Sequence, residues 1–127
     1  MTATVPIRVF ETEQDGKRIA LGPGVEATVV VDGAAGARHA VMMRLRLDAG
    51  RGYVSAVPAG AEDAWYVVEG RGTVADLVSG RAEAVEPGCV IAIEPNSRVA
   101  LRAGPAPMVL VGGPTPAATP LGVAENT

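Results

Sequence analysis

The sequence is poor in the residues that build disulfides and metal centres. Its 127 residues include one cysteine, Cys89, and one histidine, His39. A single cysteine excludes an intramolecular disulfide and any zinc site built from several cysteines. A single histidine excludes, within one chain, a metal centre that needs two imidazoles. We therefore expect no metal and no other cofactor.

Aromatic side chains and positive charge are also scarce. The chain has one Phe, one Trp and two Tyr, so its core must consist mainly of Val, Ala, Leu, Ile and Met. The formal net charge is −3. Binding to nucleic acid or to an anionic membrane surface requires clustered positive charge. We expect neither partner.

Long hydrophobic runs are absent. No run of about 18 apolar residues occurs, so the sequence predicts no transmembrane helix. Residues 1–18 lack a basic region followed by an apolar one, so no signal peptide is predicted, and we expect a cytoplasmic protein. All basic residues except Lys17 are arginines, which together with the Ala and Gly content is typical of GC-rich coding in many soil bacteria.

Turn-forming residues, in contrast, are frequent. Sixteen Gly and ten Pro divide the chain into short apolar segments, which favours short strands over long helices. Residues 38–48 alternate near their end, with Met43, Leu45 and Leu47 on one face and Arg44 and Arg46 on the other, as in a half-buried strand. Further strands are expected at residues 18–21, 25–31, 64–69, 74–78, 82–86, 90–93, 99–102 and 108–111. About eight to ten strands in one domain predict an all-β sandwich or barrel.

Two parts of the chain have the residue spacing of two known sequence motifs. Gly50 is followed by five residues, then by Ala56-Val57-Pro58, then by Asp63, and six residues later by Gly70. The second motif falls on Gly88, Glu94-Pro95-Asn96, Val99 and Ala103. In this order and spacing the chain resembles the cupin superfamily, whose members are small jelly-roll barrels. The resemblance covers about residues 25–114, so we expect an N-terminal arm or strand at 1–24, the barrel at 25–114 and an irregular tail at 115–127.

The residues at the family's metal-binding positions depart from the pattern. The four usual ligands of the family correspond here to Ala56, Pro58, Asp63 and Val99, three of which have no donor atom. One carboxylate cannot hold a divalent ion in an apolar cavity. The resemblance therefore implies a barrel of this type without metal-dependent oxygenase chemistry.

The same motif predicts which side chains face the barrel interior. Alternation from the ligand positions places an apolar lining around the carboxylate of Asp63, as is common in small-molecule sites. We expect the side chains of Tyr53, Ser55 and Tyr66 to point away from the barrel interior. The predicted substrate-binding residues are Trp65, Met43, Leu45, Val54, Ala56, Pro58, Val67, Val99, Leu101, Val109 and Val111.

Three groups could carry chemistry. Asp63 is the predicted general acid or base, and the other interpretation is a solvated carboxylate at the barrel mouth. His39 is the second predicted catalytic residue, as a partner of Asp63 in a dyad like that of metal-free epimerases of this superfamily; a surface histidine is the alternative. Arg44 and Arg46 could clamp a carboxylate or phosphate, or form a solvated face.

Three functions fit these residues. The first is a metal-independent enzyme that isomerises, cyclises, dehydrates or cleaves a hydrophobic small molecule, for which the composition suggests secondary metabolism. The second is a non-catalytic module that binds or senses a small molecule. The third is a structural protein whose barrel is filled by its own side chains. We also expect a homodimer, paired through the predicted outward row Tyr53, Ser55 and Val57.

Overall fold

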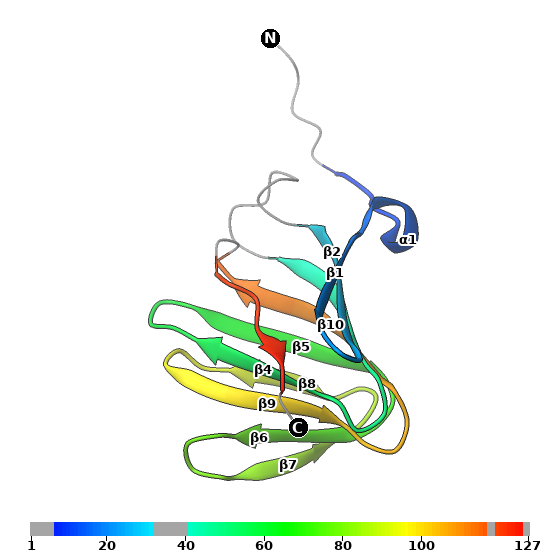
Figure 1. Cartoon of the computed structure of the whole chain (residues 1–127). Helices are drawn as coiled ribbons and strands as arrows, with labels where there is room; N and C mark the ends of the chain where they lie inside the picture. The colour runs from blue at the N-terminus through cyan, green and yellow to red at the C-terminus, as the bar shows by residue number, and fades with distance from the viewer. Residues whose placement is uncertain (1–6, 32–40, 117–118, 126–127) are drawn as a thin grey trace.

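The computed structural model describes residues 7–31, 41–116 and 119–125, and these residues form two antiparallel β-sheets around one core (Figure 1). The elements in chain order are α1 (Thr12–Asp15), β1 (Lys17–Gly22), β2 (Val25–Val31), β3 (Met42–Leu47), β4 (Gly52–Val57), β5 (Glu62–Glu69), β6 (Gly72–Asp76), β7 (Ala82–Val85), β8 (Val90–Ile93), β9 (Ser97–Ala103), β10 (Met108–Thr115) and β11 (Val123–Ala124). The all-β prediction is confirmed. His39, the predicted dyad partner, lies outside the described residues.

The chain alternates between the two sheets. The larger one, called sheet A, has the strand order β1-β2-β3-β10-β5-β8, and sheet B has the order β11-β4-β9-β6-β7. Consecutive strands β3, β4, β5 and β6 therefore fall in A, B, A and B, and this winding closes the core between the sheets. The largest fully buried side chains include Trp65, Tyr53, Leu45, Leu101 and Leu110. Burying a side chain of this size contributes about 1.5–3 kcal/mol each.

On β3, β5 and β9 the side chains that we predicted to face the barrel interior do face it. Met43, Leu45, Asp63, Trp65, Val67, Val99 and Leu101 are all buried, with exposed fractions from 0% to 8%. Arg46 points outward and is exposed, and Arg44 on the same face is half-buried. On β3 the alternation of apolar and polar residues was the guide, and on β5 and β9 the guide was the motif position of Asp63 and of Val99.

On β4 the prediction is wrong by one residue, so that the opposite face of the strand points into the barrel. Tyr53, Ser55 and Val57 are buried, whereas Val54 is half-buried and Ala56 and Pro58 are exposed. In an antiparallel sheet a one-residue shift exchanges the two faces of a strand. Burying the ring of Tyr53 and the side chain of Val57 removes more apolar surface from water than burying Ala56 and Pro58 would. The row that we expected to pair two protomers therefore lies inside the barrel.

The predicted parity of β10 is also wrong. Leu110 lies opposite Leu45 of β3 and Val67 of β5, both of which are fully buried, so the inward face of β10 carries Leu110 and not Val109 or Val111. Val109 lies opposite Arg46 and Glu69, which are both exposed, although its own side chain is only 9% exposed. The register shifts between Val109 and Leu110, and this irregularity interrupts simple alternation along the strand.

The end of the described chain is fastened to sheet B, within the segment expected to be irregular. β11 pairs with β4, and Gly122 donates a backbone hydrogen bond to Oη of Tyr53 at 2.8 Å. Arg102 on β9 donates to Glu125 through Nε at 2.7 Å and Nη2 at 2.5 Å. A bidentate guanidinium–carboxylate pair of this kind is stronger than a single neutral hydrogen bond.

This ion pair predicts a specific pH dependence. The hydrogen bond from Arg102 holds the pKa of Glu125 below its usual 4.5. A carboxyl with a lowered pKa in the folded state contributes stability above its unfolded pKa and loses that contribution as the pH falls through the folded value. Glu125→Gln should therefore lower the urea midpoint near neutral pH. The difference from the wild type should shrink as the pH falls from about 5 toward about 2. A difference that is independent of pH would show that the pair does not contribute through its charge.

Candidate functional site

A buried polar cluster lies where the two sheets face one another. Asp63 on β5 of sheet A is 4% exposed, and Ser55 on β4 of sheet B is also 4% exposed. Ser55 Oγ donates to Asp63 Oδ2 at 2.6 Å, and Trp65 Nε1 lies 3.4 Å from the same oxygen. The short separation to Ser55 is typical of a hydroxyl bound to a carboxylate. The cluster joins the two sheets through one carboxylate oxygen.

The neighbours of this cluster are apolar. Asp63 lies beside Ile93 of β8, and Ser55 lies beside Val99 of β9. Ile93 and Val99 are themselves 4% and 8% exposed. A charged group in such surroundings is costly unless hydrogen bonds compensate it. Ser55 and Trp65 therefore stabilise a carboxyl that an unpartnered apolar wall would not accommodate.

Tyr53 closes the other side of the cluster. Its ring makes an edge-to-face contact with Trp65, with ring centroids 5.9 Å apart and an interplanar angle of 77°. Burial raises the pKa of Tyr53 to about 12, which the hydrogen bond from Gly122 opposes and the charge of Asp63 reinforces. The phenol therefore stays neutral at physiological pH and takes no part as a base.

An open cleft lies between the free edges of the two sheets, where β7 ends sheet B and β8 ends sheet A. Its volume is about 350 Å³, within the range of small-molecule sites. Ile93 and Val99, the neighbours of Asp63 and Ser55, belong to its lining. The lining as a whole is Val74, Asp76, Arg81, Glu83, Ala84, Val85, Cys89, Val90, Ile91, Ala92, Ile93 and Val99. Ile93 and Val99 thus belong both to the cleft lining and to the immediate strand neighbours of the polar cluster.

The charged groups of the cleft already have partners. Arg81 pairs with Glu83 at 3.0 Å. Asp76 accepts from the backbone N–H of Val78 at 3.0 Å and from Ser79 Oγ at 2.7 Å, and the first of these bonds is the main reason that its pKa lies below the usual value. These contacts lie at the β6–β7 turn, and the other lining residues of the cleft are Val, Ala, Ile and Cys.

The donor set in the barrel does not fit a divalent metal ion. With the observed register of β4, the inward positions are Ser55 and Val57 in place of Ala56 and Pro58. Val57 and Val99 have no donor atom, and the Ser55 hydroxyl is already bound to Asp63. Within the described ranges no group of three or more His, Cys, Asp or Glu side chains converges. A single carboxylate and a single hydroxyl do not form the three- or four-ligand set of such sites.

The structure thus brings together only part of the predicted site. Asp63 and Trp65 are adjacent, and Val99 lies at the boundary between their cluster and the cleft. Val54, Ala56 and Pro58 instead line a groove on the outside of β4, beneath the chain around Leu121. The sequence reasoning missed Ser55, although the alternation Tyr53-x-Ser55-x-Val57 was a signal for it. Whether any predicted residue contacts a substrate stays a prediction.

Two antiparallel sheets with this topology define the cupin, or double-stranded β-helix, fold. The chain is similar to the polyketide cyclase RemF from Streptomyces resistomycificus, with a TM-score of 0.73 and 18% identity over 95% of this chain and 87% of that one. It is also similar to a conserved Klebsiella pneumoniae protein with a double-stranded β-helix domain, with a TM-score of 0.72 and 18% identity over 94% of this chain and 99% of that one. An RmlC-like cupin from Shewanella frigidimarina gives a TM-score of 0.69 and 19% identity over 88% and 94% of the two chains.

No protein-family model matches the sequence. No curated protein matches it either. At identities below one fifth, the structural similarity shows the fold and leaves the chemistry to be argued from the residues. None of the helices in the described part of the chain has the length and apolar character needed to cross a membrane.

Proposed function

We propose that this chain is a metal-independent enzyme that takes a small, largely apolar molecule into the cleft between β7 and β8 and acts on it through Asp63. The observation that carries the proposal is the buried Ser55–Asp63–Trp65 cluster, whose strand neighbours Ile93 and Val99 line the cleft. A carboxyl positioned in this way can move a proton in an isomerisation, cyclisation, dehydration or lyase reaction. The similarity to a polyketide cyclase agrees with such a substrate class.

In this proposal the residues of the cluster have different tasks. The bonds from Ser55 and Trp65 both go to Oδ2 of Asp63, so Oδ1 is the oxygen that exchanges a proton with the substrate. Ser55 and Trp65 hold the carboxyl in one orientation, which places its reactive oxygen without reorganisation during the reaction. The apolar side chains of the cleft hold the carbon skeleton of the substrate. The substrate reaches Asp63 when the side chains of Ile93 and Val99 turn aside.

A second candidate function, non-catalytic binding, is favoured by one observation. Asp63 is only 4% exposed, and Ser55 and Trp65 already occupy Oδ2. If Ile93 and Val99 stay in place, the cleft binds a ligand that never contacts the carboxyl. The two functions share the cleft and differ in whether Asp63 contacts the ligand.

The test measures binding and proton transfer separately. A panel of aromatic ketones such as α-tetralone is titrated against the protein by NMR, and exchange of the α-hydrogens is followed in D2O. We expect cleft binding and accelerated exchange by the wild type. Asp63→Asn should slow the exchange by a factor of about 10²–10⁴ and change affinity only a few-fold. Asp48→Asn, at an exposed position outside the cleft, is the matched control.

The outcomes separate the two candidate functions. Equal exchange rates for the wild type and Asp63→Asn, with binding retained, would assign the cleft to non-catalytic binding. Chemical-shift changes confined to residues outside the β7–β8 cleft would contradict both functions. Ile93→Ala adds a third measurement, because a wider passage to Asp63 should raise the exchange rate if the substrate enters from the cleft.

A further inference from the structure

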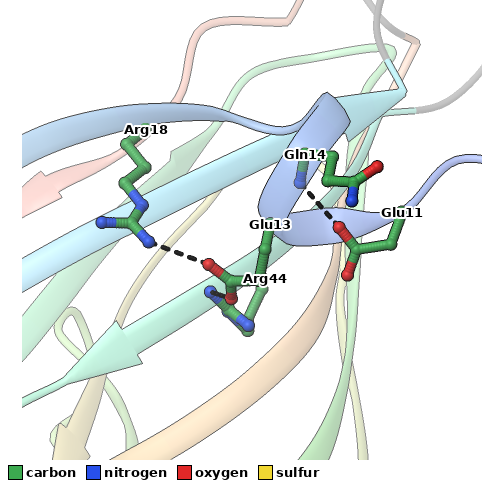
Figure 2. A network of polar contacts seen from close by, with 5 residues as sticks. All are labelled: Glu11, Glu13, Gln14, Arg18 and Arg44. Carbon is green, nitrogen blue, oxygen red and sulfur yellow. Dashed lines mark hydrogen bonds and ion pairs between the residues drawn. The ribbon is translucent and has the colours of Figure 1, made fainter.

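Most arginines in the described part of the chain already have a carboxylate partner. Glu13 of α1 binds Nη2 of Arg18 at 2.8 Å and Nη2 of Arg44 at 2.7 Å, so the carboxylate that Arg44 holds is the chain's own (Figure 2). The other ion pairs of the described residues are Arg46–Asp48, Arg71–Glu86, Arg81–Glu83 and Arg102–Glu125. Within the same ranges, the side chains of Arg51 and Arg98 make no hydrogen bond or ion pair.

The two unpaired arginines lie in different surroundings. The side chain of Arg51 lies over Gly24, and the depression that Arg51 lines also contains Glu125. Arg98 on β9 lines a groove of about 390 Å³ on the outside of sheet B, which we call the Arg98 groove. The other described residues of its lining are all uncharged: Val54, Ala56, Pro58, Pro120, Leu121, Gly122 and Val123. Among the described lining residues, Arg98 therefore carries the only charge.

The pairing of β4 with β9 places this cation beside an apolar wall. Ala56 lies opposite Arg98, and both side chains are exposed. Residues directly opposite one another in an antiparallel pair have Cβ atoms about 4.5–5.5 Å apart on the same face of the sheet. A ligand whose hydrocarbon part lies against Ala56 and Pro58 therefore has its end within reach of the Arg98 guanidinium.

The second wall of the groove is fixed in place. It consists of residues 120–123, which lead into β11. β11 pairs with β4, Gly122 donates to Oη of Tyr53 at 2.8 Å, and Glu125 binds Arg102 through two hydrogen bonds. A wall that is held in this way loses little conformational freedom when a ligand binds, and this favours affinity. The groove therefore exists before the ligand arrives.

We propose that the Arg98 groove binds a small apolar molecule that carries one carboxylate. The carboxylate binds the guanidinium, which can donate two parallel hydrogen bonds to it, and the hydrocarbon part lies against the groove walls. The site suits a single negative charge, because the neighbouring Arg102 is already bound to Glu125. A volume of about 390 Å³ lies near the lower end of the range for small-molecule sites, which favours a small ligand.

The first experiment compares ligands that share one hydrocarbon chain and differ in charge. Octanoate, octanamide and octylammonium are titrated at millimolar concentrations against the isotope-labelled protein and followed by NMR. Octanoate should bind most tightly of the three and shift the backbone signals of Ala56, Leu121 and Gly122. Octanamide or octylammonium binding as tightly as octanoate would overturn the proposal. So would the absence of octanoate binding, or shifts confined to residues outside the Arg98 groove.

A charge-removing variant tests the role of the guanidinium. Arg98→Gln should weaken octanoate binding by about fivefold or more and change octanamide binding by less than about twofold. Arg51→Gln is the matched control and should leave both affinities unchanged, because Arg51 is also exposed but lies outside the groove. Equal octanoate affinities of Arg98→Gln and the wild type would show that the cation does not hold the ligand, and the proposal would fail.

A groove-filling variant tests the apolar part of the site. Ala56→Phe places a ring in the groove at an exposed position, so it should abolish octanoate binding with an unchanged circular dichroism spectrum. Octanoate binding that survives this substitution would also overturn the proposal. Proton exchange by Asp63 inside the barrel and octanoate binding at Arg98 are measured separately. Failure of one therefore leaves the other proposal to be judged on its own assay.

Discussion

Trp65→Ala is expected to lower the free energy of unfolding by about 3–5 kcal/mol. The indole is 1% exposed, and its removal would leave a cavity between the sheets. It would also remove the edge-to-face contact with Tyr53 and the N–H that faces Asp63. A domain of this size is stable by only about 5–15 kcal/mol, so the variant should be close to unfolding at room temperature. Urea unfolding followed by circular dichroism measures the loss.

Two further variants separate packing from the hydrogen bond. Trp65→Phe fills most of the cavity and lacks the N–H, so it should recover much of the lost stability. Val78→Ala removes apolar atoms at a position that is 84% exposed, and it should change stability by less than about 0.5 kcal/mol. A Trp65→Ala variant as stable as Val78→Ala would show that the indole does not pack in the core.

Gly112→Ala is expected to have an effect of similar size through the backbone. Gly112 has φ of +148° and lies opposite Trp65, in the middle of the β10–β5 pair. A Cβ at this position would lie 2.0 Å from the backbone oxygen of Ala64, so the two strands would have to separate. The unusual φ alone costs on the order of 1–3 kcal/mol for a residue with a side chain. The clash adds to this cost, and the urea midpoint should fall sharply.

The control for Gly112 is another glycine with a positive φ and free space. Gly60 has φ of +80°, and a Cβ there would meet no atom within 4 Å. Gly60→Ala should therefore cost only the conformational part, on the order of 1 kcal/mol. Equal effects of the two substitutions would show that the close approach of β5 to Gly112 has no energetic importance.

The fold could be predicted because its evidence is local and repeated. Glycine and proline mark the turns, the alternation on β3 correctly predicted that Met43 and Leu45 point inward, and the motif position of Asp63 did the same for Trp65 on β5. In a strand with such alternation, the strand's own sequence indicates which face is buried. The prediction therefore did not depend on the strand's partners.

The two parity errors have different physical causes. On β4 the faces were assigned by counting residues from Gly50, and a count across a turn is sensitive to a difference of one residue in the turn. On β10 the run Met108-Val109-Leu110-Val111 is apolar throughout, so it contains no alternation from which to choose a face. Only the pairing of Leu110 with Leu45 and Val67 decides it.

The site was only partly predictable, because it depends on how residues from different strands come together. Asp63 was found from the motif spacing, but its partner Ser55 depends on the register of β4. The cleft depends on how far the edges of β7 and β8 stand apart, and this separation follows from the packing of two whole sheets. No residue pattern within a single strand indicates this separation.

The burial of Trp65 gives the protein a built-in optical reporter. It is the chain's only tryptophan, so intrinsic indole fluorescence comes from a single site between the sheets. Its N–H faces the carboxylate of Asp63, and its ring contacts Tyr53. The emission spectrum therefore reports the polarity around this indole in the barrel interior, and no added fluorescent label is needed. Water entry, ligand entry or a change at the carboxylate would each be recorded by the same chromophore.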